Sequence, residues 1–222
     1  GTTGFVRQMF NANELPTDEA ICCWGDEGIP AFNYNQWGAS HPMLKGFYYR
    51  RYFGVTMCNF YLTEAANYDA TMTAEVRFLR ALYYYHLMDC FGNIPFLTEV
   101  ASEPAPQASR AEVYNFIESE LLDIEGTMSA PMTGTYGRAD QAAAWMLLAR
   151  LYLNAEVYTG TAQWAKAAEY AQKIMNSAYK LHTQGSHDAV NNKDWTAYQM
   201  LFMGDNGENG AQCEAILPLL QD

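Results

Sequence analysis

The sequence is poor in positive charge. It has 13 Lys and Arg residues against 25 Asp and Glu residues, which gives its 222 residues a formal net charge of -12. Binding to a phosphate backbone requires clustered Lys and Arg side chains. We therefore predict that nucleic acid is not a main partner of this chain.

Long apolar runs are also lacking. Half of the residues are hydrophobic, but apolar stretches such as Ala142 to Ala149 are interrupted within a few helical turns. A membrane-spanning helix needs about 20 consecutive apolar residues. The sequence therefore predicts a folded domain without a membrane span.

The motifs of metal sites and of common catalytic sites are absent. The five cysteines contain no CxxC pair, and the four histidines contain no HExxH spacing. Neither a disulfide framework nor a metal nor a cofactor is predicted, and mid-helix His86 is interpreted as a core residue. Asp26 or Glu27 could serve a glycosidase with a distant partner, but solvated surface acids are the preferred interpretation. The DNGENG stretch from Asp205 favours a polar turn over a calcium loop.

Helical periodicity runs from residue 43 to residue 180. We expect five helices and no strands between them, over residues 43–66, 73–92, 109–126, 138–155 and 162–178. Thr73 is the expected N-cap of the second, and Ser109 with Glu112 forms a capping box for the third. The predicted fold class is all-α.

The last two helices carry a repeat signature. Trp145, Leu148, Ala149 and Tyr152 reproduce the spacing of the first helix of a tetratricopeptide repeat, and Trp164 with Ala167 fits the second helix. Small residues at Ala149 and Ala167 let antiparallel helices approach closely, and Trp145 and Tyr152 fill the groove between repeats. The connector NAEVYTGTAQ is longer than a standard turn. We therefore expect a decorated α/α superhelix of tetratricopeptide-like helix pairs.

The two ends of the chain lack this periodicity. Residues 1–42 are predicted to be irregular, and residues 181–222 are predicted to form a loop that leads into a strand within EAILPLLQD. Between them, Trp24, Phe32, Tyr34 and Trp37 alternate with glycines, prolines and amides. Aromatic faces stack on sugar rings and amides pair with hydroxyls, so residues 1–42 are a candidate glycan surface. The alternative is that these aromatic residues attach a long loop to the helices.

Three stretches together resemble one family. NANELPTDEA, AEVRFLRALYYYHLMDCFGNIPF and GRADQAAAWMLLARLYLNAEVYTG are similar, in this order, to the SusD/RagB family of Bacteroidetes nutrient-binding lipoproteins. The resemblance implies a non-enzymatic glycan-binding protein at the cell surface, held in the outer membrane by an N-terminal lipid and seated on a SusC-like TonB-dependent transporter. Family members are about twice this length, so the chain is expected to be a fragment of one domain that lacks its N-terminal anchor and C-terminal half.

The resemblance also implies site residues. Arg7 matches an arginine of the sugar site in the starch-binding member, and Trp24 matches an aromatic residue of that site. Cys22 stands where that member has another aromatic residue, and Asp26 and Glu27 replace a following asparagine, which predicts a glycan other than starch.

We therefore expect Arg7, Trp24, Tyr34 and Trp37 to bind oligosaccharide or polysaccharide for delivery to the transporter. A tetratricopeptide-type protein-interaction module and a helical glycoside hydrolase are the alternatives.

Overall fold

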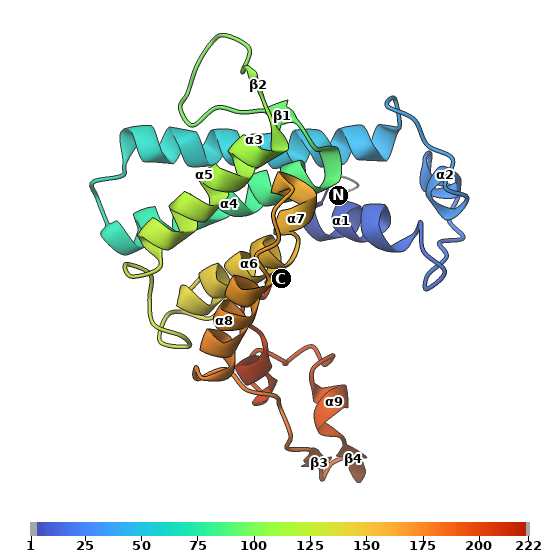
Figure 1. Cartoon of the computed structure of the whole chain (residues 1–222). Coiled ribbons are helices and arrows are strands. Elements are labelled where there is room, and N and C mark those ends of the chain that lie inside the picture. The colour runs from blue at the N-terminus through green and yellow to red at the C-terminus, as the bar shows by residue number, and fades with distance from the viewer. Residues whose placement is uncertain (1–3, 221–222) are drawn as a thin grey trace.

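The protein is mostly helical, as Figure 1 shows. A computed structural model describes residues 4–220. Its α-helices are α1 (Phe5–Glu14), α2 (Ile29–Asn33), α3 (Pro42–Glu64), α4 (Ala70–Phe91), α5 (Arg110–Ile124), α6 (Gln141–Leu153), α7 (Ala155–Thr159), α8 (Trp164–Met175) and α9 (Ala197–Met200). A 3₁₀ helix, η1, covers Ala211–Glu214. The helical fold class predicted from the sequence is confirmed.

Two short antiparallel strand pairs accompany the helices. β1 (Ile94–Pro95) pairs with β2 (Gln107–Ala108), and β3 (Ser186–Asp188) pairs with β4 (Lys193–Trp195). The expectation of no strands between the helices is therefore wrong for the connection between α4 and α5. The strand expected in EAILPLLQD is also wrong over residues 215–220, where Ile216 and Leu217 pack against the helical core without a partner strand.

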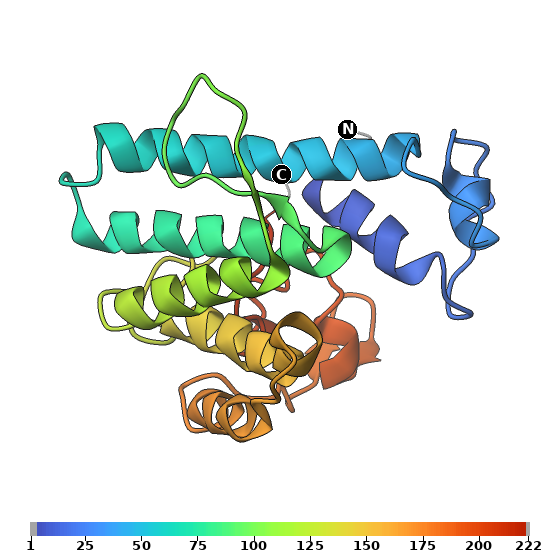
Figure 2. The same ribbon diagram turned by 45° about the horizontal axis from the view of Figure 1, so that its top comes forward.

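The long helices pack as neighbouring pairs. α3 lies against α4, α4 against α5, and α6 against α8, and Figure 2 shows these helices stacked one below the other. Their shared interior contains large hydrophobic side chains that are essentially inaccessible to water, among them Phe78, Tyr84, Leu87, Ile117, Leu121 and Leu148. Removal of this apolar surface from water is the main driving force for the stack.

The helix starts follow side-chain caps. Ser109 and Glu112 form the predicted capping box, in which the Glu112 carboxylate accepts from the backbone N–H of Ser109 at 2.7 Å. The predicted cap at Thr73 is wrong. Asp69 caps α4 instead by accepting from the N–H of Met72 at 2.7 Å, while the Thr73 hydroxyl donates to a preceding carbonyl group. An N-cap carboxylate satisfies N–H groups that have no partner inside the helix.

The repeat signature falls on the packed pair α6 and α8. Leu148 and Tyr152 are buried, and the Tyr152 ring lies 5.6 Å from that of Tyr170 on α8. Ala167 is buried at the same contact, as the small-residue argument requires. Trp164 begins the second helix, as the signature predicts, and 61% of its surface is exposed.

Residues 1–42 are not irregular throughout, because α1 covers ten of them. The most deeply buried residues of α1 are polar, Gln8 and Asn11, whereas Val6 and Phe10 on its apolar side are about half exposed. Arg51 of α3 holds α1 in place. It donates to the carbonyl oxygen of Phe5 at 3.2 Å, and its guanidinium carbon lies 3.7 Å from the Phe5 ring centroid. Arg7 is thereby carried on a fixed helix.

Candidate functional site

The candidate surface lies at one end of the molecule, where α1 and α2 pack beside the start of α3 (Figure 1). A small apolar cluster forms its base, made of the buried side chains Leu15, Ile29, Phe32 and Met43. This cluster is separate from the main core of the helical stack. The connection between α1 and α2 is therefore supported from below by its own packing.

Asn33 fixes the middle of this connection. Its side-chain amide donates to the carbonyl oxygen of Cys22 at 2.7 Å and accepts from the N–H of the same residue at 3.3 Å. Asn35 adds a bond from its amide to the carbonyl oxygen of Pro16 at 3.1 Å. Each such bond contributes a net gain of about 1 kcal/mol, in addition to the packing of the small apolar cluster. The amides of Asn33 and Asn35 are thus engaged within the protein.

Gly28 fixes the end of the connection. Its φ of 96° lies in the left-handed region, and a Cβ atom there would come within 2.9 Å of the His41 ring. The Gly28 carbonyl oxygen accepts from Nε2 of His41 at 3.0 Å, while Nδ1 of His41 accepts from the N–H of Leu44. This pair of bonds assigns the proton of the neutral imidazole to Nε2 and ties the loop to the start of α3.

Arg7 and Trp24 come together on the outer side of the loop. The Arg7 guanidinium carbon lies 5.8 Å from the Trp24 ring centroid, and a guanidinium nitrogen lies 3.5 Å from a carboxylate oxygen of Asp26. Trp24 is 66% exposed. The arrangement presents an open aromatic face beside hydrogen-bond donors and acceptors, which is the chemistry that sugar rings require.

Tyr34 and Trp37 lie at the other end of α2. Tyr34 is 67% exposed, and Trp37 is 42% exposed with its ring 5.8 Å from the buried Phe32. Phe32 is therefore the aromatic residue that attaches the segment to the small apolar cluster, whereas Trp24, Tyr34 and Trp37 remain accessible. Among residues 4–220, no ring contact joins Trp24 to Tyr34 or Trp37, so the structure unites Arg7 with Trp24 and leaves the other two as neighbours on the same segment.

His86 is buried in α4. Burial, aided by the positive charges of Arg51 and Arg150, lowers its pKa to about 3, which keeps the ring neutral. A neutral buried imidazole fits the interpretation of His86 as a core residue.

The DNGENG segment forms a turn in which the Asp205 carboxylate accepts from the Asn209 amide at 3.0 Å. Over residues 4–220, no group of three or more His, Cys, Asp or Glu side chains is arranged to hold a metal ion.

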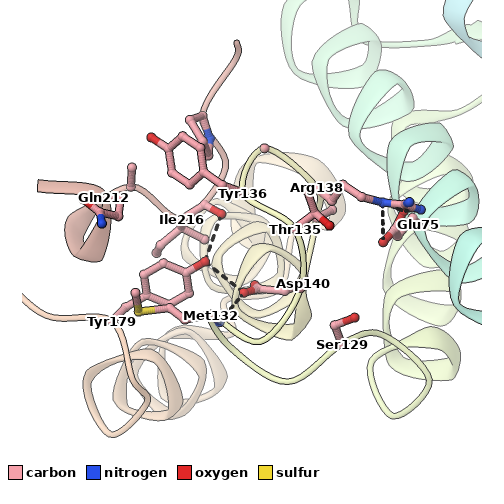
Figure 3. Close-up of a pocket in the computed structure, with 15 residues that line it drawn as sticks. Glu75, Ser129, Met132, Thr135, Tyr136, Arg138, Asp140, Tyr179, Gln212 and Ile216 are labelled. Carbon is pink, nitrogen blue, oxygen red and sulfur yellow. Dashed lines mark hydrogen bonds and ion pairs between the residues drawn. The ribbon is translucent and has the colours of Figure 1, made fainter. Parts of the chain in front are cut away.

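A separate hollow, shown in Figure 3, lies between the start of α6 and residues 215–218. Asp140 is central to it, accepting from the Tyr179 hydroxyl at 2.9 Å and from the N–H of Met132 at 2.9 Å. Arg138 at its rim pairs with Glu75. The hollow has a volume of about 150 Å³, and the carboxylates of Asp140 and Glu75 are engaged in bonds within the chain.

Comparison with known families identifies the chain. The family described as starch-binding and associating with the outer membrane matches residues 24–153, more than half of the sequence. The chain belongs to the SusD-like family. Its relative in Bacteroides thetaiotaomicron, the starch-binding protein SusD, is 42% identical over 228 aligned residues, which include all of this chain and 39% of the relative. The membership of the SusD/RagB family that the sequence suggested is therefore confirmed.

Solved SusD-like structures share the fold. A crystal structure with a xylogluco-oligosaccharide matches at a TM-score of 0.75 and 23% identity, with 97% of this chain and 43% of that chain covered. A laminarin-binding SusD-like protein matches at a TM-score of 0.62 and 25% identity, with 82% and 39% covered. The present chain therefore spans about two fifths of the length of these relatives.

Within the described residues 4–220, no helix is both long enough and apolar enough to cross a membrane. Association with the outer membrane is part of the description of the matching family.

Proposed function

We propose that the protein captures oligosaccharide or polysaccharide at the cell surface and passes it, uncleaved, to a SusC-like TonB-dependent transporter in the outer membrane. An N-terminal lipid would hold it there, and the helix pairs would continue as a tetratricopeptide-like superhelix. The observation that carries the proposal is the exposed Trp24 face with the Arg7 guanidinium beside it.

The contacts would divide by chemistry. Trp24 stacks on the apolar C–H face of one sugar ring, and Arg7 donates hydrogen bonds to the hydroxyls of that ring or its neighbour. Tyr34 and Trp37, which are also accessible, extend the surface along the glycan. Cys22 packs against the small cluster under the loop, where the starch-binding relative would have an aromatic residue according to the resemblance. A smaller stacking area supports a ligand other than starch.

The test compares Trp24→Ala with Trp164→Ala in the full-length protein. The two tryptophans have similar exposure, 66% and 61%, but Trp164 begins α8, away from α2 (Figure 1). Loss of about 1 kcal/mol of stacking predicts a roughly fivefold weaker affinity for Trp24→Ala. Affinity gels with starch, xyloglucan and laminarin measure the loss, and thermal unfolding verifies that both variants stay folded.

Unchanged retention of every bound glycan by Trp24→Ala, or an equal loss for Trp164→Ala, would refute this site. A large drop in melting temperature with unchanged binding would assign Trp24 to the structure of the loop.

The second candidate function is a protein-interaction module. It is favoured by an apolar cleft of about 610 Å³ between α1, α4 and α6, whose walls include Leu79, Leu82 and Met146. Binding of a peptide that is abolished by Met146→Asp and unaffected by Trp24→Ala would support this alternative.

A further inference from the structure

The segment that carries the candidate site is strongly acidic. Over residues 4–41, Arg7 is the only Lys or Arg residue, whereas five carboxylates lie half-buried or exposed, at Glu14, Asp18, Glu19, Asp26 and Glu27. Screening at physiological salt limits exposed charges to a range of about 8 Å, so the residues around Arg7 decide which ligands it meets. Asp26 lies beside Arg7, and Glu27 follows Asp26 in the chain. Because the two carboxylates outnumber the one guanidinium, the local charge is negative.

The positive charge of Arg7 is already engaged. A guanidinium nitrogen of Arg7 lies 3.5 Å from a carboxylate oxygen of Asp26, and the two side chains are 33% and 40% exposed. A sugar carboxylate or sulfate could pair with Arg7 only in two ways. It would have to displace the Asp26 carboxylate, or it would have to lie close to that carboxylate, which carries the same negative charge. A neutral sugar meets no such conflict, because its hydroxyls can accept from the remaining guanidinium N–H groups and donate to the Asp26 carboxylate.

We propose that Asp26 makes the Trp24 surface selective for uncharged glycans over glycans that carry uronic acids or sulfates. This inference rests on the proposed glycan-binding function and adds the residue that sets its charge preference. Asp26 acts in two ways, by neutralising the cation beside the aromatic face and by placing a carboxylate within reach of the ligand.

The experiment uses one polysaccharide in two forms. A neutral polysaccharide that the full-length protein retains is compared with the same polysaccharide after oxidation of part of its C6 hydroxyl groups to carboxylates. The wild-type protein should bind the oxidised form at least about tenfold more weakly at low salt, because a like charge a few ångströms away is repelled. Added salt should reduce the difference.

Two variants that each remove one negative charge separate local from global effects. Asp26→Asn should reduce the ratio of the affinities for the neutral and the oxidised form at least about fivefold, because it frees Arg7 and removes the nearby carboxylate. Glu156→Gln, on the exposed face of α7, removes the same charge elsewhere and should leave the preference at its wild-type value. Glu27→Gln provides a second local variant should Asp26→Asn fail to fold.

Each remaining outcome overturns one of the two proposals. Equal or tighter wild-type binding of the oxidised form, or an unchanged preference in folded Asp26→Asn whatever Glu27→Gln does, would overturn the role of Asp26 while leaving glycan binding intact. Retention of no neutral or acidic polysaccharide by the wild-type protein would instead overturn the proposed function.

Discussion

At the scale of single residues, the most demanding arrangement is a buried charge network between three helices. Glu120 of α5 accepts from Arg77 at 2.7 Å and from Arg80 at 2.8 Å, both on α4. Arg80 also donates to the Asn59 side chain on α3 and to the carbonyl oxygen of Thr98, each at 3.0 Å. Burial alone would raise the pKa of Glu120, but the two arginines outweigh burial and lower it.

We expect Glu120→Gln to destabilise the protein by about 3 kcal/mol at neutral pH, because it leaves Arg80 buried without its charge partner. Because the folded pKa of Glu120 is lowered, its contribution is present above the unfolded value near 4.3 and is lost as pH falls below it. Urea unfolding of wild type and variant from pH 7 to pH 3 should show their difference shrinking in acid. Glu169→Gln, on the exposed surface of α8, is the control, and a difference independent of pH would contradict the assignment.

Single residues also divide into those that the sequence could reveal and those that it could not. His86 could be predicted as a core residue because it lies in the middle of an apolar helix. The exposure of Trp24 could not be predicted, because glycines and a proline break any period around it and Phe32 of the same segment is buried. The pairing of Arg7 with Asp26 could not be predicted either, because it joins α1 to a loop that is distant in the sequence. The burial of Arg51 against Phe5 could not be predicted either, because no local sequence pattern indicates it.

At the scale of elements, helix boundaries depend on caps that compete over a few residues. Asp69 and Thr73 are both acceptable N-caps, but it is Asp69 that accepts from the N–H of Met72, while the Thr73 hydroxyl donates to the carbonyl oxygen of Ala66. α1 illustrates the opposite limit. Its apolar residues Phe5, Val6, Met9 and Phe10 do recur at helical spacing, but the helix is only 10 residues long, which is too short for the period to stand out. By contrast, Ser109 with Glu112 could be predicted correctly because a capping box satisfies two N–H groups within four residues.

The start of α5 gives a prediction at this scale. Ser109→Ala removes the hydroxyl that accepts from the N–H of Glu112 and should cost about 1 kcal/mol of stability in chemical denaturation. Ser119→Ala is a matched control on the same helix, because the Ser119 hydroxyl only donates to the carbonyl oxygen of Phe116 three residues before it. Ser119→Ala should change stability by no more than a few tenths of a kcal/mol. Equal losses in the two variants would show that the capping box contributes nothing.

At the scale of the whole molecule, the fold is held without covalent cross-links. All five cysteines are free thiols, and they are spread over the loop before α2, helices α3 and α4, and η1. Stability therefore comes from the apolar core of the helical stack and from networks such as that around Glu120.

This absence of cross-links predicts that reduction has no effect on stability. The melting temperature with an excess of dithiothreitol should equal that without it, because no disulfide constrains the unfolded chain. Differential scanning calorimetry on monomeric protein measures both conditions, with a cysteine-free variant as the control. A decrease of several degrees in reductant would show a disulfide that the structure does not contain.

The bonds at the two ends of the candidate loop have a consequence for protein engineering. Asn33 holds the backbone of Cys22 in the way a neighbouring strand would, and His41 holds Gly28. The five residues between Cys22 and Gly28, Cys23 to Glu27, therefore form a short segment whose two ends are both held by hydrogen bonds. New ligand preferences could then be installed by replacing this short stretch alone, while the helices that support it keep their sequence.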